Sequence, residues 1–458
     1  MNSVSLTLTA LILGGMVGCR ARTATPASEF AEPSTASGPV TVAGRQFLDA
    51  AGKPMILHGI NVVNKSKAEG YIGDLSADDF ATIRSWGMNC VRLGIFWDGL
   101  EPEPGRIDEG YLERIAQLIA WARTEGLLVL LDMHQDLYSV KFGDGAPAWA
   151  TLDEGKPHTT GAVWSDAYYI SEAVQTAFDH FWANSPAADG VGLQDHYARV
   201  WRRVAERFKD EPAVLGFDVM NEPIPGRDAG RVQLVMLAWL AEQLTRRPEV
   251  PALTVEALAG IQGTSSGRRQ LTGWLADLDL YQGMLEAGSP IMQEFDRNQL
   301  QPFYARVRKA IREVNTQHLI FFEPAMSANL GIHSALVPLT DEQGQRDPRQ
   351  AYAPHGYDIV VDTSSLELTS QERVALIFRR HGEFAERYQL PMLVGEWGAY
   401  YLDGRAADAA RFVVQQFDAL GCGDTYWQYN RALAESPLLP ALRRQLRHES
   451  HRAQQRKD

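Results

Sequence analysis

The sequence predicts an α/β protein built as one (β/α)8 barrel, or TIM barrel, with long insertions after its third and fourth strands. Short apolar runs alternate with amphipathic stretches through most of the 458 residues. The runs are apolar almost throughout, which is typical of parallel strands covered on both faces. Two runs end in a glutamate, within Asn221-Glu222-Pro223 and Gly395-Glu396-Trp397. Because parallel barrel strands end at one mouth, these two carboxylates can meet there.

The chain before the barrel predicts export. Residues 1–18 carry no charged side chain, and the apolar run Leu6 to Val17 is too short to span a bilayer but suits a signal peptide. Met16-Val17-Gly18-Cys19 resembles the lipobox of bacterial lipoproteins, although no Lys or Arg precedes the apolar run. We therefore expect lipidation of Cys19, which would anchor the protein at the cell envelope, on the outer membrane or cell surface. Simple secretion and a misassigned start codon stay open.

Residues 19–39 are predicted to form a flexible tether. They consist largely of Ala, Thr, Ser, Pro and Glu and lack the bulky apolar side chains of a core. The folded catalytic domain is expected to span 40–458. A hydrophobic content of 45% allows a large core, so one barrel with insertions is favoured over several small domains.

Eight apolar runs are the predicted barrel strands. In chain order they are Met55–Val62, Met88–Ile95, Leu127–His134, Val214–Asn221, His318–Glu323, a poorly defined run before His355, Pro391–Glu396 and Thr425–Asn430. The plainest helices between them, several with apolar residues at i, i+3 and i+4, are Ala77–Trp86, Tyr111–Glu125, Tyr197–Phe208, Phe303–Val314, Ser370–Tyr388 and Asp408–Leu420. This alternation predicts the barrel. Residues 432–458 are predicted to be a helix and a charged tail.

Two connections are far longer than usual, from Leu137 to about Leu193 and from Pro223 to about Leu300. Long connections in compact domains are usually lids or binding subsites, and both of these leave from the predicted mouth. The first is rich in aromatic residues, which suits stacking on a sugar ring or an apolar group. We expect about two thirds of these aromatics to pack the core of the insertion itself.

Charge and cysteine content exclude other classes. The net charge of -13 argues against a protein that binds duplex nucleic acid. The three cysteines, Cys19, Cys90 and Cys422, are too few for a disulfide framework and fit no metal spacing. We expect a monomer without a cofactor or metal.

The two glutamates point to glycoside hydrolysis. This reaction needs one carboxyl group that protonates the leaving oxygen and another, ionised, that attacks the anomeric carbon. Glu222 is the candidate for the first role, with Asn221 beside it to hold the sugar 2-hydroxyl. Glu396, with Trp397 beside it, is the second candidate.

At these positions the chain resembles family 5 of the glycoside hydrolases, a retaining (β/α)8 group, through nearly every strand end. The resemblance implies that Glu222 is the acid/base and Glu396 the nucleophile. It implies supporting roles for Arg92 in Val91-Arg92-Leu93-Gly94, His134 in Asp132-Met133-His134-Gln135-Asp136, Asn221, and His355 and Tyr357 in Pro354-His355-Gly356-Tyr357-Asp358, and a sugar platform at Trp427. For a retaining enzyme we expect the two carboxyl groups to lie about 5 to 5.5 Å apart. We also expect the pKa of Glu222 to lie above that of an ordinary glutamate, because ionised Glu396 disfavours a second negative charge.

Within the family the chain resembles endoglycoceramidases, which release ceramide from glycosphingolipids. The likeness lies in His58-Gly59-Ile60-Asn61-Val62-Val63-Asn64-Lys65-Ser66 and in the run Asp132 to Ser139. It implies contacts of Lys65, Asp136 and Trp182 with sugar hydroxyls and a ring face. An ammonium and a carboxylate together can bind one vicinal diol. The C-terminal β-sandwich typical of that subgroup is not expected here.

The sequence leaves several alternatives open. Gly263-Thr264-Ser265-Ser266-Gly267 matches an esterase pattern but lacks a preceding strand. Asp132, His134 and Asp136 could ligate a metal, and Glu323 could be a third carboxylate, for which a structural role is favoured. An endo-β-glucanase or β-glucosidase acting on soluble glycans is the main alternative function. A non-catalytic glycan-binding lipoprotein is the second.

Overall fold

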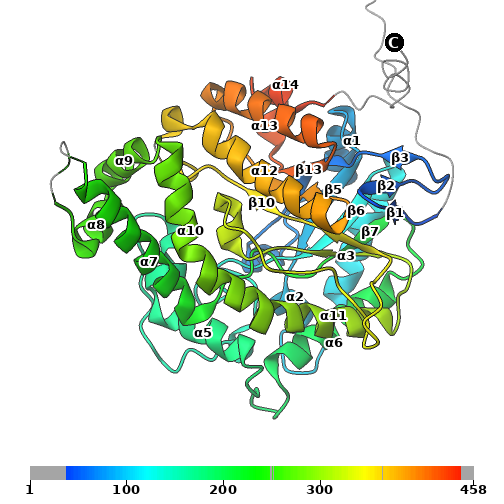
Figure 1. Cartoon of the computed structure of the whole chain (residues 1–458). Helices are drawn as coiled ribbons and strands as arrows, with labels where there is room; N and C mark the ends of the chain where they lie inside the picture. The colour runs from blue at the N-terminus through cyan, green and yellow to red at the C-terminus, as the bar shows by residue number, and fades with distance from the viewer. Residues whose placement is uncertain (1–37, 248–249, 251, 364, 445–458) are drawn as a thin grey trace, which may run out of the picture. The chain divides into compact units, whose positions relative to one another are not determined.

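The computed structural model describes residues 38–247, 250, 252–363 and 365–444 and confirms the barrel (Figure 1). Its eight strands are β4 (His58–Val62), β5 (Cys90–Ile95), β6 (Leu128–Met133), β7 (Val214–Asp218), β8 (Leu319–Phe322), β9 (Gln350–Tyr352), β11 (Leu393–Val394) and β13 (Gly423–Tyr426). They pair in parallel in the order β11-β13-β4-β5-β6-β7-β8-β9. A parallel bridge between Tyr352 and Met392 joins the two edge strands.

The apolar character of the strands explains their position. Every residue of the eight strands is buried except Leu128, which is partly buried. The first and last predicted strands need correction, because Met55 belongs to a separate strand and the last strand ends at Tyr426 instead of Asn430. Leu57, between Met55 and His58, packs into the apolar cluster at the amino-terminal end of the barrel.

Helices cover the outside of the barrel where the periodicity predicts them. These are α1 (Ala77–Ser85), α3 (Glu109–Thr124), α6 (Leu193–Arg207), α11 (Gln301–Arg312), α12 (Gln371–Tyr388) and α13 (Ala407–Leu420). Two of them begin after a side-chain cap: Asp108 accepts from the backbone N–H of Tyr111 before α3, and Ser370 from that of Arg373 before α12. A short helix, α2 (Trp97–Leu100), follows β5.

Both predicted insertions are present. The first, between β6 and α6, contains α4 (Ala167–Ile170) and α5 (Glu172–Trp182). The second, between β7 and α11, contains α7 (Gly226–Thr245), α8 (Val255–Gln262), α9 (Ser265–Trp274) and α10 (Leu278–Phe295). Figure 1 shows α7 to α10, in green, grouped to one side of the barrel strands.

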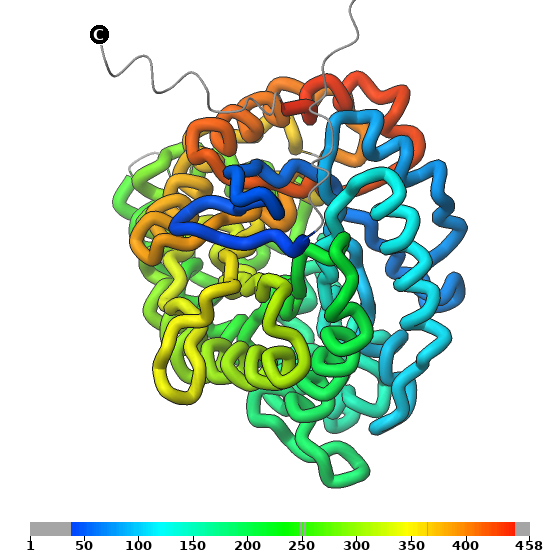
Figure 2. The backbone as a smooth tube through the Cα atoms, turned by 90° about the vertical axis from the view of Figure 1, so that its right-hand side faces the viewer, coloured from blue at the N-terminus to red at the C-terminus, as the bar shows by residue number. Residues whose placement is uncertain are grey.

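A small antiparallel sheet lies at the other end of the barrel from the mouth. It consists of β1 (Thr41–Ala43), β2 (Gln46–Leu48) and β3 (Pro54–Met55). Phe47 of this sheet stacks on Phe321 of β8, with ring centroids 6.0 Å apart. Figure 2 shows the sheet, in dark blue, crossing in front of the barrel.

Two short strands extend the barrel at its mouth. β10 (His355–Gly356) pairs in parallel with β12 (Glu396–Trp397), and the register sets His355 opposite Glu396. After β13 the chain forms a 3-10 turn (Arg431–Glu435) and the short helix α14 (Leu439–Leu442). The predicted signal peptide, Cys19, most of the tether and the charged tail lie outside the described residues. No helix in the described part of the chain is both long and apolar enough to cross a bilayer.

Candidate active site

Glu396 lies at the centre of the mouth, where it accepts two hydrogen bonds. Arg92 Nη1 donates to Glu396 Oε1 over 2.7 Å, and the Tyr357 hydroxyl donates to Oε2 over 2.9 Å. Glu396 is 5% exposed. Both donors stabilise the ionised carboxylate, which a nucleophile requires.

Arg92 is fully buried on β5 and surrounded by four carboxylates. Its guanidinium lies 2.7 to 2.9 Å from Asp132, Asp218, Glu323 and Glu396. Burial acts to lower the pKa of Arg92, but these carboxylates raise it well above its ordinary value. The cation is therefore permanent. It fixes the ends of β5, β6, β7, β8 and β12 around one centre.

Glu222 follows β7 in an unusual backbone conformation. Its φ is +45°, in the left-handed region that glutamate rarely adopts. The backbone N–H of Glu222 donates to Glu323 Oε2 over 2.8 Å, which holds this conformation. Its Oε1 atom accepts a hydrogen bond from Asn329 Nδ2 over 2.6 Å and lies 2.9 Å from His355 Nδ1. Oε2 is thereby left for a reacting group.

The two glutamates are close enough for a double displacement. Glu222, His355 and Glu396 each contribute one side-chain atom to a group whose members all lie within 4.8 Å of one another. Retaining glycosidases place their carboxyl groups about 5 to 5.5 Å apart, whereas inverting enzymes need about 6.5 to 9.5 Å to admit a water. The geometry therefore fits direct attack by a carboxylate.

The pKa values of the pair differ from the prediction. Burial raises the pKa of Glu396 to about 7, against the charges of His355 and Arg92. Burial also acts to raise the pKa of Glu222, but the hydrogen bond and charge of His355 outweigh it and leave that pKa below its ordinary value. The expectation that Glu222 titrates above an ordinary glutamate was therefore wrong, and the raised pKa falls on Glu396.

His355 is the source of this difference. Burial acts to lower its pKa, but the charges of Glu323 and Glu396 and the hydrogen bond with Glu222 raise it well above 6.5. His355 Nε2 lies 3.3 Å from Glu323 Oε1, and Nδ1 lies between the two catalytic candidates. A protonated His355 therefore holds a proton within hydrogen-bond distance of Glu222.

Four predicted residues line the mouth beside the glutamates. The Lys65 ammonium pairs with Asp136 and lies 4.7 Å from the ring centroid of Trp427. The imidazole of His134 stacks on Trp427, with centroids 5.4 Å apart and planes inclined by 14°. Its Nδ1 lies 2.8 Å from Asp132, while Nε2 has no hydrogen-bond partner among the described residues. These groups offer a ring face and several donors and acceptors for sugar hydroxyls.

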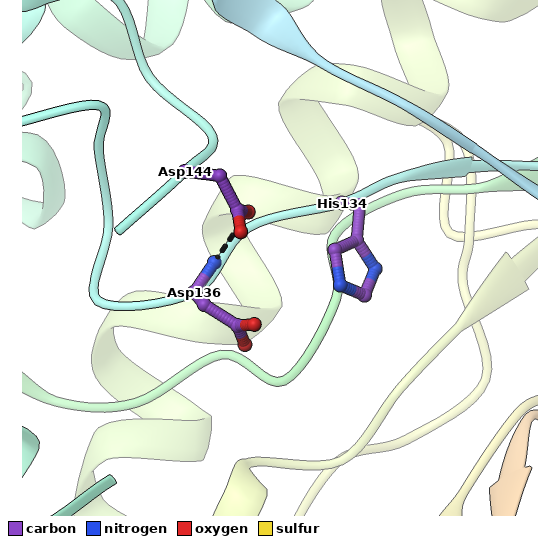
Figure 3. A group of neighbouring side chains, drawn as sticks. All are labelled: His134, Asp136 and Asp144. Atoms are coloured by element: carbon purple, nitrogen blue, oxygen red, sulfur yellow. Dashed lines mark hydrogen bonds between the residues drawn. The ribbon is translucent and has the colours of Figure 1, made fainter. Parts of the chain in front are cut away.

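Figure 3 shows His134 and Asp136 with Asp144, whose carboxylate accepts from the backbone N–H of Asp136 over 2.9 Å. Single ligand atoms of these three residues lie within 4.8 Å of one another. The Lys65 ammonium already provides a cation at Asp136, and the charges of Asp136 and Asp144 raise its pKa although burial acts to lower it. We therefore assign no metal to this cluster.

Trp182 does not join the site, which corrects its predicted role. Its ring packs against Phe181, Phe295 and Phe303, and its indole N–H donates to the Ile224 carbonyl over 2.9 Å. The Trp182 ring is therefore enclosed by other aromatic side chains and does not face a sugar. Another tryptophan of the same insertion, Trp164, lines the cavity, with its ring centroid 5.8 Å from the Lys65 ammonium.

One cavity of about 420 Å³ contains the site. At one end, which we call the sugar end, it is lined by Lys65, His134, Asp136, Trp164, Asn221, Glu222, Tyr357, Glu396 and Trp427. It continues into a region that we call the apolar arm, formed by side chains of α7, α9 and α10 and of the segment after β8. These are Val232, Met236, Leu237, Leu271, Leu275, Met284, Met292, Leu330 and Ile332.

Sequence reasoning missed or undervalued some of these residues. Asn329 follows β8 in a 3-10 turn (Met326–Leu330), and no motif marks it. Glu323, for which a structural role was favoured, contacts both Arg92 and the backbone of Glu222. The position of Glu323 at the end of a predicted strand could have indicated that it faces the mouth of the barrel. Ser265 is exposed at the start of α9 and follows α8, not a strand, so the esterase pattern has no support.

Comparison with known proteins agrees with this geometry. The endoglycoceramidase of Cyanea nozakii is 33% identical over 233 residues, which cover 44% of this chain and 45% of that protein. A glucosylceramidase of Rhizopus delemar is 30% identical over 245 residues, covering 41% of this chain and 36% of that protein. The chain thus spans less than half the length of these curated relatives.

Solved structures match more of the chain. Endo-glycoceramidase II from Rhodococcus sp., in its ganglioside GM3 complex, is 26% identical with a TM-score of 0.64, covering 87% of this chain and 81% of that one. An endogalactoceramidase is 25% identical with a TM-score of 0.62, covering 88% and 78%. The family model for cellulase (glycosyl hydrolase family 5) matches residues 48–433. With this match over most of its length, the chain belongs to glycosyl hydrolase family 5.

Proposed function

We propose that the protein is a retaining β-glycosidase that cleaves the bond between a sugar and the lipid part of a glycolipid, most specifically glycan-ceramide, by double displacement. The observation that carries this proposal is a single cavity that joins the glutamate pair to the apolar arm. A lipid aglycone needs both features next to each other, because burial of alkyl groups supplies the binding free energy.

In the first step, a Glu396 oxygen attacks the anomeric carbon while the bond to the aglycone oxygen breaks. Glu222 gives its proton to that oxygen. Glu222 needs this proton first, and His355 Nδ1, 2.9 Å from Glu222 Oε1, is placed to supply it. Arg92 and Tyr357 keep Glu396 ionised for the attack.

In the second step, water replaces the enzyme at the anomeric carbon. Glu222, now ionised, takes a proton from the water, whose oxygen bonds to the anomeric carbon as the bond to Glu396 breaks. The sugar leaves with its original anomeric configuration. Asn329 holds Glu222 in place through both steps, and the proton that Glu222 takes from the water can return to His355 Nδ1.

The names of relatives support the lipid class. Two relatives are an endoglycoceramidase and a glucosylceramidase, and one similar structure is a ganglioside GM3 complex. A glucanase or β-glucosidase acting on soluble glycans would need aromatics and amides on the leaving-group side. Beyond the sugar end the cavity lining is instead rich in Leu, Ile, Val and Met, beside the amides of Gln233 and Gln262 and the phenol of Tyr169. A non-catalytic role is disfavoured because both glutamates and their hydrogen-bonding partners are in place.

Thin-layer chromatography of digests tests the proposal. The panel is glucosylceramide, galactosylceramide, lactosylceramide, a ganglioside and a cello-oligosaccharide, each with the wild type and with Glu396→Gln as the inactive control. Release of ceramide from at least one glycolipid, with little cleavage of the cello-oligosaccharide, is expected. Preferential cleavage of the cello-oligosaccharide would favour the soluble-glycan alternative, and no cleavage of any substrate or of an aryl β-glycoside would favour the binding protein.

We also propose that Cys19 is lipidated and holds the domain at the cell envelope. The apolar leader and the lipobox-like run support this, and a membrane-bound substrate would make an anchor useful.

A further inference from the structure

Helix α9 turns one mixed face toward the cavity. Arg268, Leu271 and Thr272 of α9 all line it, and so does Leu275, the residue just after the helix; their spacing is the i, i+3, i+4 and i+7 of one helix face. Leu271 and Leu275 belong to the apolar arm. Arg268 and Thr272 place a guanidinium and a hydroxyl among apolar side chains, which is costly unless these groups have partners.

Arg268 is only partly satisfied by the protein. Its Nη2 atom lies 2.6 and 2.5 Å from the two oxygens of Asp166, and the side chains of the pair are only 17% and 12% exposed. Its Nε atom is buried and has no hydrogen-bond partner in the described part of the chain. A buried donor without a partner costs free energy. Nε itself is closed off, but the Arg268 side chain as a whole is 17% exposed and lines the cavity, so a ligand acceptor can add a partner to the guanidinium there.

The Asp166–Arg268 pair lies in the same cavity as Glu222. Tyr169 also lines the cavity, and burial raises its pKa together with the charges of both Glu222 and Asp166. Tyr169 is therefore within electrostatic reach of both carboxylates. Asp166 ends the 3-10 turn that begins with Trp164 of the sugar end, and Arg268 shares α9 with Leu271 of the apolar arm. The pair therefore lies where these two parts of the cavity meet.

We propose that Arg268 and Thr272 form a binding site for a hydrogen-bonding group of the aglycone close to the glycosidic bond, of the amide and hydroxyl type found in ceramide. The inference rests on the proposed function and names the residues that would distinguish an amide-bearing aglycone from a plain alkyl one. An alkyl or steryl aglycone has no acceptor for Arg268 beyond the glycosidic oxygen. Such an aglycone would leave the guanidinium with Asp166 as its partner and would bind less well.

The competing interpretation is that Arg268 only links the two insertions through Asp166. Such a role would affect stability and all substrates alike. The next residue offers a matched control, because Arg269 on the outer face of α9 pairs with Glu367, is 54% exposed and does not line the cavity. Arg268→Met and Arg269→Met therefore remove the same charge from two faces of one helix.

The experiment measures kcat/KM for glucosylceramide and for dodecyl β-glucoside in mixed micelles, and the melting temperature of each variant. Arg268→Met should lower the kcat/KM for glucosylceramide, divided by that for dodecyl β-glucoside, by about tenfold or more. This is the loss expected for a hydrogen bond to a charged group. Thr272→Val, which keeps the side-chain shape, should lower the same ratio by about threefold to tenfold. Arg269→Met should leave the ratio unchanged.

The outcomes separate the inference from the proposed function. An unchanged ratio in both Arg268→Met and Thr272→Val overturns the inference, whatever their melting temperatures. If Arg268→Met does not fold, the ratio measured for Thr272→Val alone supports or overturns it. A wild type that cleaves dodecyl β-glucoside but not glucosylceramide also overturns it while leaving a glycolipid-type glycosidase in place. A wild type that cleaves neither, but cleaves cello-oligosaccharide, overturns the proposed function itself.

Discussion

At the scale of single residues, two hydrogen bonds, one of them from a buried cation, set the chemistry of Glu396. Arg92 and Tyr357 donate to its two oxygens, and burial acts in the opposite direction to raise its pKa to about 7. The carboxylate must be ionised to attack. The rate should therefore fall as the pH drops below about 7, because protonated Glu396 is no nucleophile.

The pH profile of kcat/KM on an aryl β-glycoside tests this balance. We expect a bell with its acidic limb near 7 and an alkaline limb at higher pH, where His355 and Glu222 lose the proton of the acid. Tyr357→Phe removes a donor to ionised Glu396, so its pKa should rise and the acidic limb should move up by about one pH unit. A profile flat through the neutral and mildly alkaline range would remove Glu222 from the acid role.

Chemical rescue separates the two glutamates. Glu222→Ala should lose about 10²-fold to 10⁴-fold in kcat/KM on substrates with poor leaving groups but keep glycosylation of a dinitrophenyl β-glycoside, and azide should then give a β-glycosyl azide. Glu396→Gly should lose turnover, and azide should give the α-glycosyl azide. The anomer is read by NMR. A β-to-α conversion with the Glu222 variant would mean that the roles are exchanged.

The placement of a residue in the mouth was predictable where a motif sits within a predicted strand or just after it, as with Arg92, Glu222 and Glu396. It was not predictable for Asn329, because a turn residue reaches Glu222 only through the fold. Trp182 and Trp164 show the same limit. Both lie in one aromatic-rich insertion, and only the packing of Trp182 against Phe295 and Phe303 decides which ring lines the cavity.

At the scale of elements, the apolar runs and helical periodicity sufficed for the barrel because its strands are buried on both faces. The exact ends of the strands could not be predicted from the sequence. Glu396 of β12 was merged with the predicted strand Pro391–Glu396, and β10 was not predicted, because a two-residue strand has no period of its own. The small sheet β1 to β3 was also missed, since its strands are only two or three residues long.

That small sheet should contribute stability and not catalysis, because it lies at the amino-terminal end of the barrel. Phe47 is 3% exposed and stacks on Phe321. Phe47→Ala should lower the free energy of unfolding by about 3 to 5 kcal/mol, seen as a lower urea midpoint. Exposed Lys53 on the same sheet-forming segment gives the control, Lys53→Ala, with little change. A change in KM of folded Phe47→Ala would contradict this separation.

At the scale of the whole molecule, function depends on a barrel and two insertions that share one cavity. The barrel supplies the glutamates, and the insertions supply Trp164 and most of the apolar arm. Sequence could place both insertions at the mouth. It could not show that the second closes an apolar space beside Glu222, because that depends on how α7, α9 and α10 pack together.

The proposed anchor belongs to this scale because it concerns where the cavity meets its substrate. A net charge of -13 makes the chain a poor electrostatic ligand for anionic lipid, so a covalent lipid would be the effective attachment. In a bacterium that processes lipoproteins, the wild type should fractionate with membranes and Cys19→Ser should appear in the soluble fraction. Both should hydrolyse a soluble aryl β-glycoside at the same rate, because Cys19 precedes the barrel, whereas Cys19→Ser should act more slowly on glycolipid in whole cells. Intact mass spectrometry showing a soluble wild type with unmodified Cys19 would defeat the anchor and leave the proposed glycosidase chemistry untouched.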